Sequence, residues 1–187
     1  MPRIHPVAPA DQSIEIREIL ATRPSYNIYN TLAHAPTLLP GFIQLASAIL
    51  TKTELDPKIR ELVIIRVGGH CQSAYELHQH KRLALKVGVT PDQIENCLSL
   101  LPRTFGTSEE DTLLAFTDAV VKQIKVPEDL FQATKKWLSD REMTELLITI
   151  GTYMMVSRFL ENSGVEIETD PVDIDSKSFY PQSTQTG

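Results

Sequence analysis

The sequence has few cysteines, no strongly basic segment and no long apolar run, and each of these absences excludes a class of protein. Its 187 residues include two cysteines, Cys71 and Cys97, which form neither a disulfide framework nor a CxxC redox motif. We therefore expect a cytoplasmic protein with reduced thiols. The net charge is −6 and no block of lysine or arginine stands out. We accordingly expect neither a nucleic acid nor a membrane surface as a partner.

Transmembrane helices, a signal peptide and β-strands are also missing from the pattern. No apolar run reaches the roughly 18 residues that a membrane-spanning helix needs. The longest one, LLITIGTYMMV, stops at Ser157 and Arg158. The N-terminal MPRIHPVAPADQS lacks the apolar centre of a signal peptide. Since no run alternates between polar and apolar residues as a strand would, the sequence predicts a soluble protein built of helices.

Apolar residues recur at helical spacing along most of the chain and predict an all-α fold of roughly eight to nine helices. We expect a proline-rich N-terminal arm at residues 1–10, a single domain at residues 11–164 and an extended C-terminal tail at residues 165–187. Capping residues mark several helix ends. Asp56 begins a helix that we expect to end at the glycines in positions 68 and 69.

Two of the predicted helices are apolar on nearly every side. They contain the segments IRELVIIRV and LLITIGTYMMV. A helix that is hydrophobic all round is buried in a core or in a subunit interface. Two such helices in a chain of this size predict a homo-oligomer whose subunits share apolar faces.

The segment HCQSAYELHQH, residues 70–80, contains the densest group of reactive side chains. On a helix, Glu76 and His80 are spaced i, i+4, so their side chains share one face, and this is the apolar face that also carries Ser73. Burial raises the pKa of a carboxyl group and a neighbouring imidazolium lowers it. Such a pair can therefore be tuned for proton transfer near neutral pH.

The other polar residues of this helix differ in their angular position. Tyr75 and Gln79 are predicted on the solvent side, and His78 at the edge of the apolar arc. Because His78 and His80 diverge around the helix, they cannot easily share a metal ion. We expect no metal site and no cofactor.

Two charged residues, Glu61 and Arg66, lie inside the preceding apolar helix. Charges in such surroundings are usually paired. If the chain turns back after the glycines, the two helices pack antiparallel, and Glu61 can approach Glu76 and His80. Whether Glu61 and Arg66 form a structural ion pair or belong to the site is open at this point.

The segment RELVIIRVGGHCQSAYELHQHKRLALKVGVTPDQIE resembles the core motif of the carboxymuconolactone decarboxylase family, within the alkylhydroperoxidase D-like superfamily. The matching elements are Arg60-Glu61-Leu62, Glu76-Leu77 followed by His80, Ala84, and Gly88-Val89-Thr90. The resemblance implies an alkylhydroperoxidase D-like helical bundle that is oligomeric, with cofactor-free sites near subunit contacts.

The same resemblance separates two branches of the superfamily. The peroxidase branch carries the redox motif C-x-x-C-x-x-x-H on the second helix. The matching positions in this chain are Ser73, Glu76 and His80, so both redox cysteines are absent. The pattern is therefore similar to the decarboxylase branch, and Glu61 matches a glutamate that both branches have on the first helix.

The residues and the resemblance together predict a cofactor-independent lyase or isomerase acting on a small molecule, for example by decarboxylation of an organic acid or lactone. In this scheme His80 transfers the proton, Glu76 orients it or shares the proton, and Glu61 sets the local electric field. Contacts with the substrate are predicted for Arg66, Ser73, Tyr153 and His78.

Two alternatives stay open. The first is a thiol-dependent, peroxidase-like antioxidant protein that uses Cys71, with a second thiol from Cys97 or another molecule. In a plainer interpretation, Cys71 is only a small buried apolar residue. The second alternative is a non-catalytic helical oligomer that binds a ligand and in which Glu76 and His80 form a plain ion pair.

Overall fold

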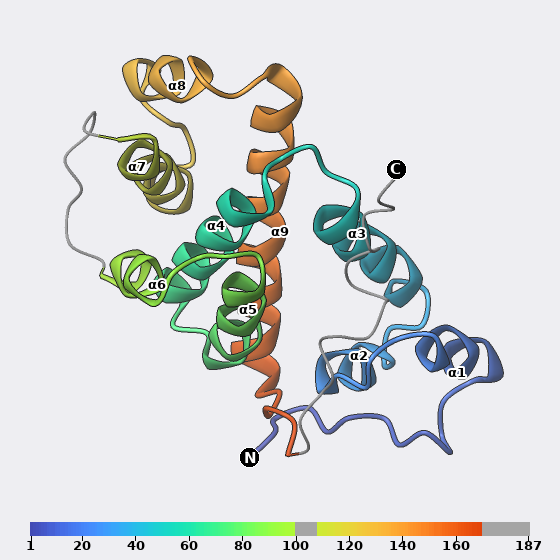
Figure 1. The fold of residues 1–187 in the computed structure, drawn as a ribbon. Helices are drawn as coiled ribbons and strands as arrows, with labels where there is room; N and C mark the ends of the chain where they lie inside the picture. Colours follow the sequence, from blue (N-terminus) through green and yellow to red (C-terminus); the bar gives the residue numbers. More distant parts are fainter. Residues whose placement is uncertain (100–107, 170–187) are drawn as a thin grey trace, which may run out of the picture. The chain divides into compact units, whose positions relative to one another are not determined.

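The computed structural model describes residues 1–99 and 108–169. Over these residues the chain forms nine helices and no strand (Figure 1), which confirms the all-α prediction for this part of the chain. The helices are α1 (Ile14–Ala21), α2 (Asn27–Leu32), α3 (Leu39–Thr51), α4 (Pro57–Cys71), α5 (Ala74–Lys86), α6 (Pro91–Leu98), α7 (Glu109–Gln123), α8 (Glu128–Lys135) and α9 (Asp140–Ser163).

The chain divides into two compact units. One contains Met1–Lys52 together with the chain from Leu160 onward, and the other is Thr53–Phe159. The arm at 1–10, the domain at 11–164 and the tail at 165–187 stay predictions. The part of the tail from residue 170 lies outside the described residues.

The first unit has its core between its helices. Ile16 of α1 packs with Leu39 and Ile43 of α3, and these three side chains are buried. Ser13 caps the start of α1, because its side chain accepts a hydrogen bond from the Ile16 backbone N–H at 3.2 Å. The N-terminal segment joins the same unit through backbone hydrogen bonds to the carbonyl of Ser163.

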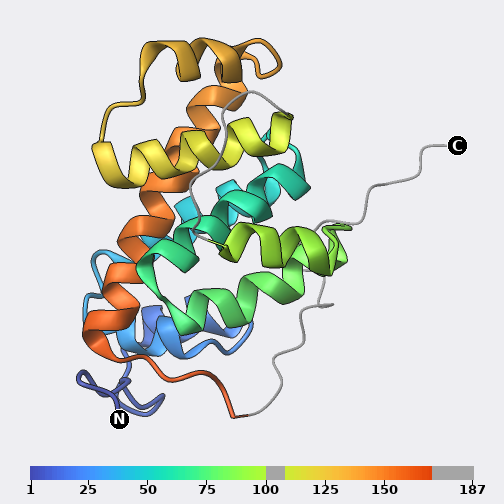
Figure 2. The ribbon, with the colours of Figure 1, turned by 90° about the vertical axis from the view of Figure 1, so that its left-hand side faces the viewer.

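The central helix of the second unit is α4. Asp56 caps its start by accepting from two backbone N–H groups, and every residue from Arg60 to Gly68 is buried. In Figure 2, α4 lies between α7 and α5, and α6 also packs against it. The expectation that IRELVIIRV is a buried helix is therefore confirmed.

The turn between α4 and α5 differs from the predicted one. Helix α4 does not end at Gly68 but continues to Cys71, and Gln72 then takes the left-handed conformation, with φ 52°. The two helices run in opposite directions, as Figures 1 and 2 show. Gly68 instead permits their close approach, because a Cβ at this position would lie 3.1 Å from the Leu77 side chain.

Helix α9 keeps an apolar strip in contact with solvent. Leu147, Ile148 and Met155 are 39%, 50% and 48% exposed. We call these three residues the α9 strip. We expected LLITIGTYMMV to be buried on all sides. In the single chain, only part of this segment is buried.

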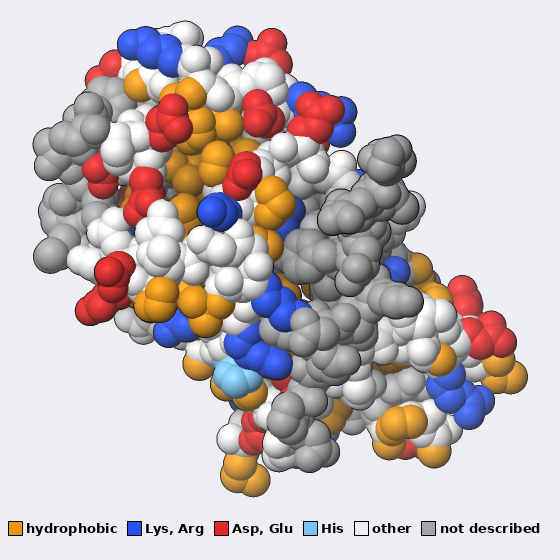
Figure 3. All heavy atoms as spheres, in the orientation of Figure 1, with side chains coloured by type: hydrophobic (Ala, Val, Ile, Leu, Met, Phe, Trp, Pro, Cys, Tyr) orange, Lys and Arg blue, Asp and Glu red, His pale blue; other side chains and the backbone are white. Residues whose placement is uncertain are grey.

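The surface in Figure 3 carries acidic and basic side chains that are interspersed, with apolar side chains between them. Among the described helices, none combines the length and the apolarity that crossing a membrane requires.

Candidate active site

Helix α5 is more deeply buried than its hydrophobic pattern predicts. Glu76 and His80 face inward as predicted, but Tyr75 and Gln79, predicted on the solvent side, are only 4% and 7% exposed. The prediction failed because α5 packs against both α4 and α6, which cover more than one face. His78, by contrast, is exposed, so it does not share the buried surroundings of His80.

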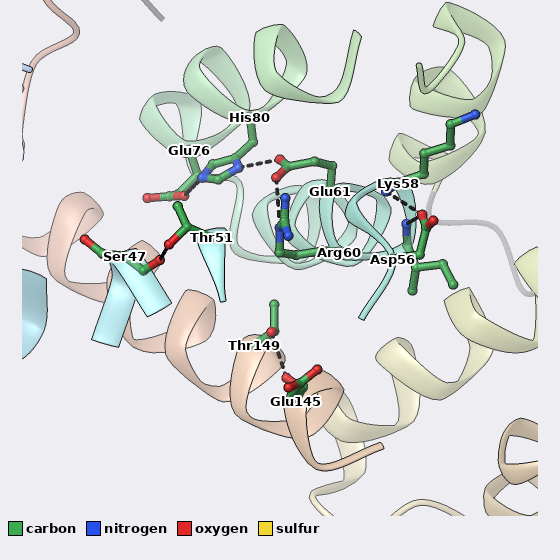
Figure 4. Close-up of polar contacts among 11 residues, drawn as sticks. Ser47, Thr51, Asp56, Lys58, Arg60, Glu61, Glu76, His80, Glu145 and Thr149 are labelled. Atoms are coloured by element: carbon green, nitrogen blue, oxygen red, sulfur yellow. Dashed lines mark hydrogen bonds and ion pairs between the residues drawn. The ribbon is translucent and has the colours of Figure 1, made fainter. Parts of the chain in front are cut away.

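His80 lies between two carboxylates (Figure 4). Its Nδ1 is 2.7 Å from Glu61 Oε2, and its Nε2 is 3.4 Å from Glu76 Oε2. The side chains of Glu61, Glu76 and His80 are 0%, 6% and 8% exposed. The antiparallel packing of α4 and α5 therefore brings Glu61 to the face that carries Glu76 and His80.

Two further side chains border this group. Arg60 Nε donates to Glu61 Oε1 at 3.4 Å (Figure 4). The Tyr153 ring of α9 meets the His80 ring edge-on, with centroids 4.8 Å apart and an interplanar angle of 89°. Tyr153, which we predicted as a substrate contact, thus supports His80 through its ring. Sequence reasoning did not single out Arg60 as a neighbour of the site.

Burial and neighbouring charges shift both titrating groups toward neutral pH. Burial raises the pKa of Glu76 to about 7, against the lowering effect of His80 and with a further raising effect of Glu61. Burial would lower the pKa of His80, but the Glu61 carboxylate and its hydrogen bond, together with Glu76, raise it above its usual value. Near neutral pH, Glu76 is therefore close to its titration midpoint, and the raised pKa of His80 favours its protonated form. Two groups that can exchange a proton thus lie side by side.

These shifts predict that the protein loses stability as the pH rises through neutral. The folded pKa of Glu76 is about 7, well above that of an unfolded glutamate, so folding disfavours its ionised form. The raised pKa of His80 acts in the same direction, because the stability it supplies is lost as the imidazolium loses its proton.

We expect the melting temperature of the wild-type protein to fall by a few degrees between pH 6 and pH 9. The fall should be smaller in Glu76→Gln, which cannot ionise at this position. A carboxyl ¹³C titration of Glu76 by NMR should show a midpoint near 7. A midpoint at the ordinary glutamate value would contradict the environment described for Glu76.

Some buried polar atoms at the start of α5 and on α9 have no hydrogen-bond partner within the part of the chain that the structure describes. Among them are Ser73 Oγ, Glu76 Oε2 and Ser157 Oγ. Ser73 is 0% and Ser157 1% exposed. Leaving a buried polar group without a hydrogen bond costs about 1–3 kcal/mol. These atoms therefore mark positions where a bound molecule or water would be stabilised.

Arg66 belongs to a second buried cluster, in the C-terminal half of α4. Its Nε and Nη2 donate to Asp118 Oδ1 and Oδ2 of α7 at 2.6 and 2.7 Å. Its Nη1 donates to two backbone carbonyls at the end of α6. His70 Nε2 lies 2.6 Å from the same Asp118 Oδ1. Although burial would raise it, the hydrogen bonds from His70 and Arg66 hold the pKa of Asp118 well below its usual range.

This cluster answers the question that the sequence left open about Arg66. The buried arginine is paired, as expected, but with Asp118 and not with Glu61. Its guanidinium is occupied by these contacts, which gives no support to the predicted contact with a substrate carboxylate. Asp118 was not singled out from the sequence, where nothing distinguishes it from other acidic residues.

Neither cysteine of this chain takes part in a disulfide. Both are reduced thiols, and Cys71 is partly buried at the end of α4, whereas Cys97 is buried in α6. Among the residues that the structure describes, no group of three or more histidine, cysteine, aspartate or glutamate side chains could hold a metal ion.

The sequence profile of the Carboxymuconolactone decarboxylase family matches residues 36–119. This segment contains α4 and α5, and with them Glu61, Glu76 and His80. Over that segment the chain is similar to this family. The resemblance drawn from the core motif is therefore confirmed. No curated protein matches the sequence.

Solved structures share the fold of this chain. A peroxidase-related protein with an alkylhydroperoxidase AhpD core from Ralstonia eutropha JMP134 has a TM-score of 0.75 at 18% identity, over 90% of this chain and 93% of that chain. A peroxidase-related protein from Silicibacter sp. TM1040 has a TM-score of 0.67 at 15% identity, over 83% and 82%. The debrominase Bmp8, as a variant in complex with 2,3,4-tribromopyrrole, has a TM-score of 0.68 at 15% identity, over 89% and 91%. At these identities the likeness is one of fold, and it confirms the alkylhydroperoxidase D-like architecture.

Proposed function

We propose that this protein is a cofactor-independent lyase or isomerase in which His80 and Glu76 move a proton on a small organic acid or lactone. The observation that carries the proposal is the buried His80 between Glu61 and Glu76, with Glu76 titrating near neutral pH. Perturbed, buried acid–base pairs of this kind are typical of sites that transfer protons. The family profile over residues 36–119 supports the same reaction class.

In the proposed lyase reaction, the bond between the carboxyl carbon and its neighbour breaks and carbon dioxide leaves. The electron pair stays on the remaining carbon as an enolate, because an adjacent carbonyl accepts it. Glu76 or His80 then delivers a proton to that carbon, and water restores the proton. In an isomerase, the same pair removes a proton from one carbon and returns it at another.

Glu61 acts in this scheme as a positioning residue. Its carboxylate accepts a hydrogen bond from His80 Nδ1, which directs Nε2 toward Glu76. Fixing the ring through one nitrogen determines which nitrogen exchanges the proton. Arg60 balances the charge of Glu61 from the other side.

The reaction class can be tested without knowing the natural substrate. Wild-type protein and His80→Gln are incubated in ²H₂O with a panel of β-keto acids and unsaturated lactone carboxylates, followed by mass spectrometry and NMR. A decarboxylating lyase releases carbon dioxide and leaves a product with one deuterium. An isomerase incorporates deuterium and releases no carbon dioxide. Binding without any turnover by the wild-type protein would favour the non-catalytic ligand-binding oligomer.

A thiol-dependent peroxidase is the second candidate. Two structural neighbours carry the name peroxidase-related, and Cys71 is a partly buried free thiol. Its thiolate would break the O–O bond of a peroxide, becoming a sulfenic acid that a second thiol reduces. Cys97 is 0% exposed, so that thiol would come from another molecule. Equal peroxide consumption by wild-type protein and Cys71→Ser would exclude this candidate.

We further propose that the α9 strip is a contact between subunits of a homo-oligomer. Its three large apolar side chains are 39–50% exposed in the single chain, and such patches mark association surfaces. Ile148→Lys combined with Met155→Lys should convert the oligomer to a monomer, as measured by light scattering after size exclusion. Ile124→Lys is the matched control, because Ile124 is 91% exposed outside the strip. A monomeric wild-type protein, or an unchanged assembly in the double variant, would contradict this proposal.

A further inference from the structure

We propose that the start of α5 binds a negatively charged oxygen of the substrate, with the hydroxyl groups of Ser73 and Ser157 as donors. The inference rests on the function proposed above and names what the same site recognises. The ligand would be a small monoanion that carries a carboxylate or develops an enolate oxygen.

Ser73 holds the capping position of α5 without capping the helix. Its side chain accepts no hydrogen bond from the first turn, whereas Ser13 on α1 and Ser108 on α7 each accept one. The Ser73 Oγ is fully buried and has no partner. The hydroxyl therefore stays available beside the positive end of the helix dipole, where an anion is stabilised.

The second buried hydroxyl without a partner belongs to Ser157 of α9. It lies one turn after Tyr153, whose ring contacts His80, and residues spaced i, i+4 share a helix face. Ser157 therefore lies on the same side of α9 as the ring that contacts His80.

The Ser157 hydroxyl is also uncommitted. A buried hydroxyl on a helix ordinarily donates to the carbonyl four residues earlier. Thr149 of the same helix does so, to the Glu145 carbonyl at 2.7 Å, and so does Thr117 of α7, to the Leu113 carbonyl at 2.9 Å. Ser157 Oγ has no partner although the residue is 1% exposed.

When His80 and Glu76 are both protonated, the charges around His80 favour a ligand that carries one negative charge. Protonated His80 and Arg60 contribute two positive charges, and Glu61 contributes one negative charge. With Glu76 protonated, the buried group has a net charge of +1. Buried charges are usually compensated, so one bound anion would neutralise the site. Protonated Glu76, whose Oε2 lies 3.4 Å from His80 Nε2, would then be a third donor to the ligand.

The test uses acetate and levulinate as probes, because neither loses carbon dioxide readily, and their methyl esters as neutral counterparts. Affinities are measured by calorimetric titration of the full-length protein. We expect the wild-type protein to bind each acid more tightly than its ester. Ser73→Ala and Ser157→Ala should each weaken binding of the acids about tenfold or more, since a hydrogen bond to a charged group is lost. Binding of the esters should change little.

Ser13→Ala is the matched control, because it removes a serine that does cap its helix in the first unit. It should leave the affinity for the acids unchanged, and thermal unfolding of every variant checks the fold. Equal affinity of the serine variants and the wild-type protein would mean that these hydroxyls hold only an ordered water and would overturn the proposal. Equal binding of acid and ester, or no binding by the wild-type protein, would overturn it as well.

The outcome separates this proposal from the reaction proposed above. If the serine variants bind the acids more weakly and the wild-type protein turns over no substrate, the anion site is supported and the proposed lyase or isomerase reaction is contradicted. If the wild-type protein turns over a substrate and both serine variants bind the acids as tightly as it does, the reaction is supported and the anion site is contradicted.

Discussion

Replacing His80 with glutamine should lower turnover about 10²–10⁴-fold, the range that a positioned general acid or base typically contributes. The glutamine amide can still donate to Glu61 Oε2, which His80 Nδ1 now contacts at 2.7 Å. The buried Glu61 carboxylate therefore keeps a partner, and the fold should persist. What the variant lacks is a group that exchanges a proton near neutral pH.

The measurement is kcat and kcat/KM for the substrate found in the deuterium experiment. His34→Gln is the matched control, because His34 is an exposed histidine of the first unit whose ring bonds only a backbone carbonyl among the contacts described for it. It should keep full activity. Circular dichroism melting of both variants separates loss of chemistry from loss of fold. Full activity in His80→Gln would show that the proton is moved by another group.

The part of the site that could be predicted from the sequence depends on local geometry. Glu76 and His80 are four residues apart on an apolar helix face, and this spacing alone brings their side chains together. Glu61 followed from the expectation that consecutive helices pack antiparallel. The burial of Tyr75 and Gln79 could not be predicted, because a helical pattern gives the direction of a side chain but not how many neighbours cover it.

Two other features depend on contacts that no local pattern encodes. The partner of Arg66 is 52 residues away, on α7. Burial of Arg66 required a carboxylate partner, but many acidic residues could have supplied it. Ser73 is the opposite case, because serine at a helix start predicts a cap. In the structure this serine does not cap α5, and only the three-dimensional contacts reveal its free hydroxyl.

Asp118→Ala should lower the free energy of unfolding by about 3–5 kcal/mol, the cost of removing one partner of a buried ion pair. Arg66 is 0% exposed and would keep its charge without the two Asp118 oxygens that it now contacts. His70 would lose its partner as well. The measurement is urea unfolding near neutral pH.

The matched control for this large effect is Glu54→Ala, which removes the carboxylate of an exposed pair with Arg141 at 2.6 Å. Both partners of that pair are more than half exposed, so the change should alter the free energy of unfolding far less than Asp118→Ala does. The pH dependence gives a second check. Because the folded pKa of Asp118 is depressed, the stability that it supplies is fully present above its unfolded pKa of about 4 and is lost as the pH falls. The difference in the free energy of unfolding between wild-type protein and Asp118→Ala should therefore become smaller in acid. If this difference is already small at neutral pH, Arg66 has found another partner.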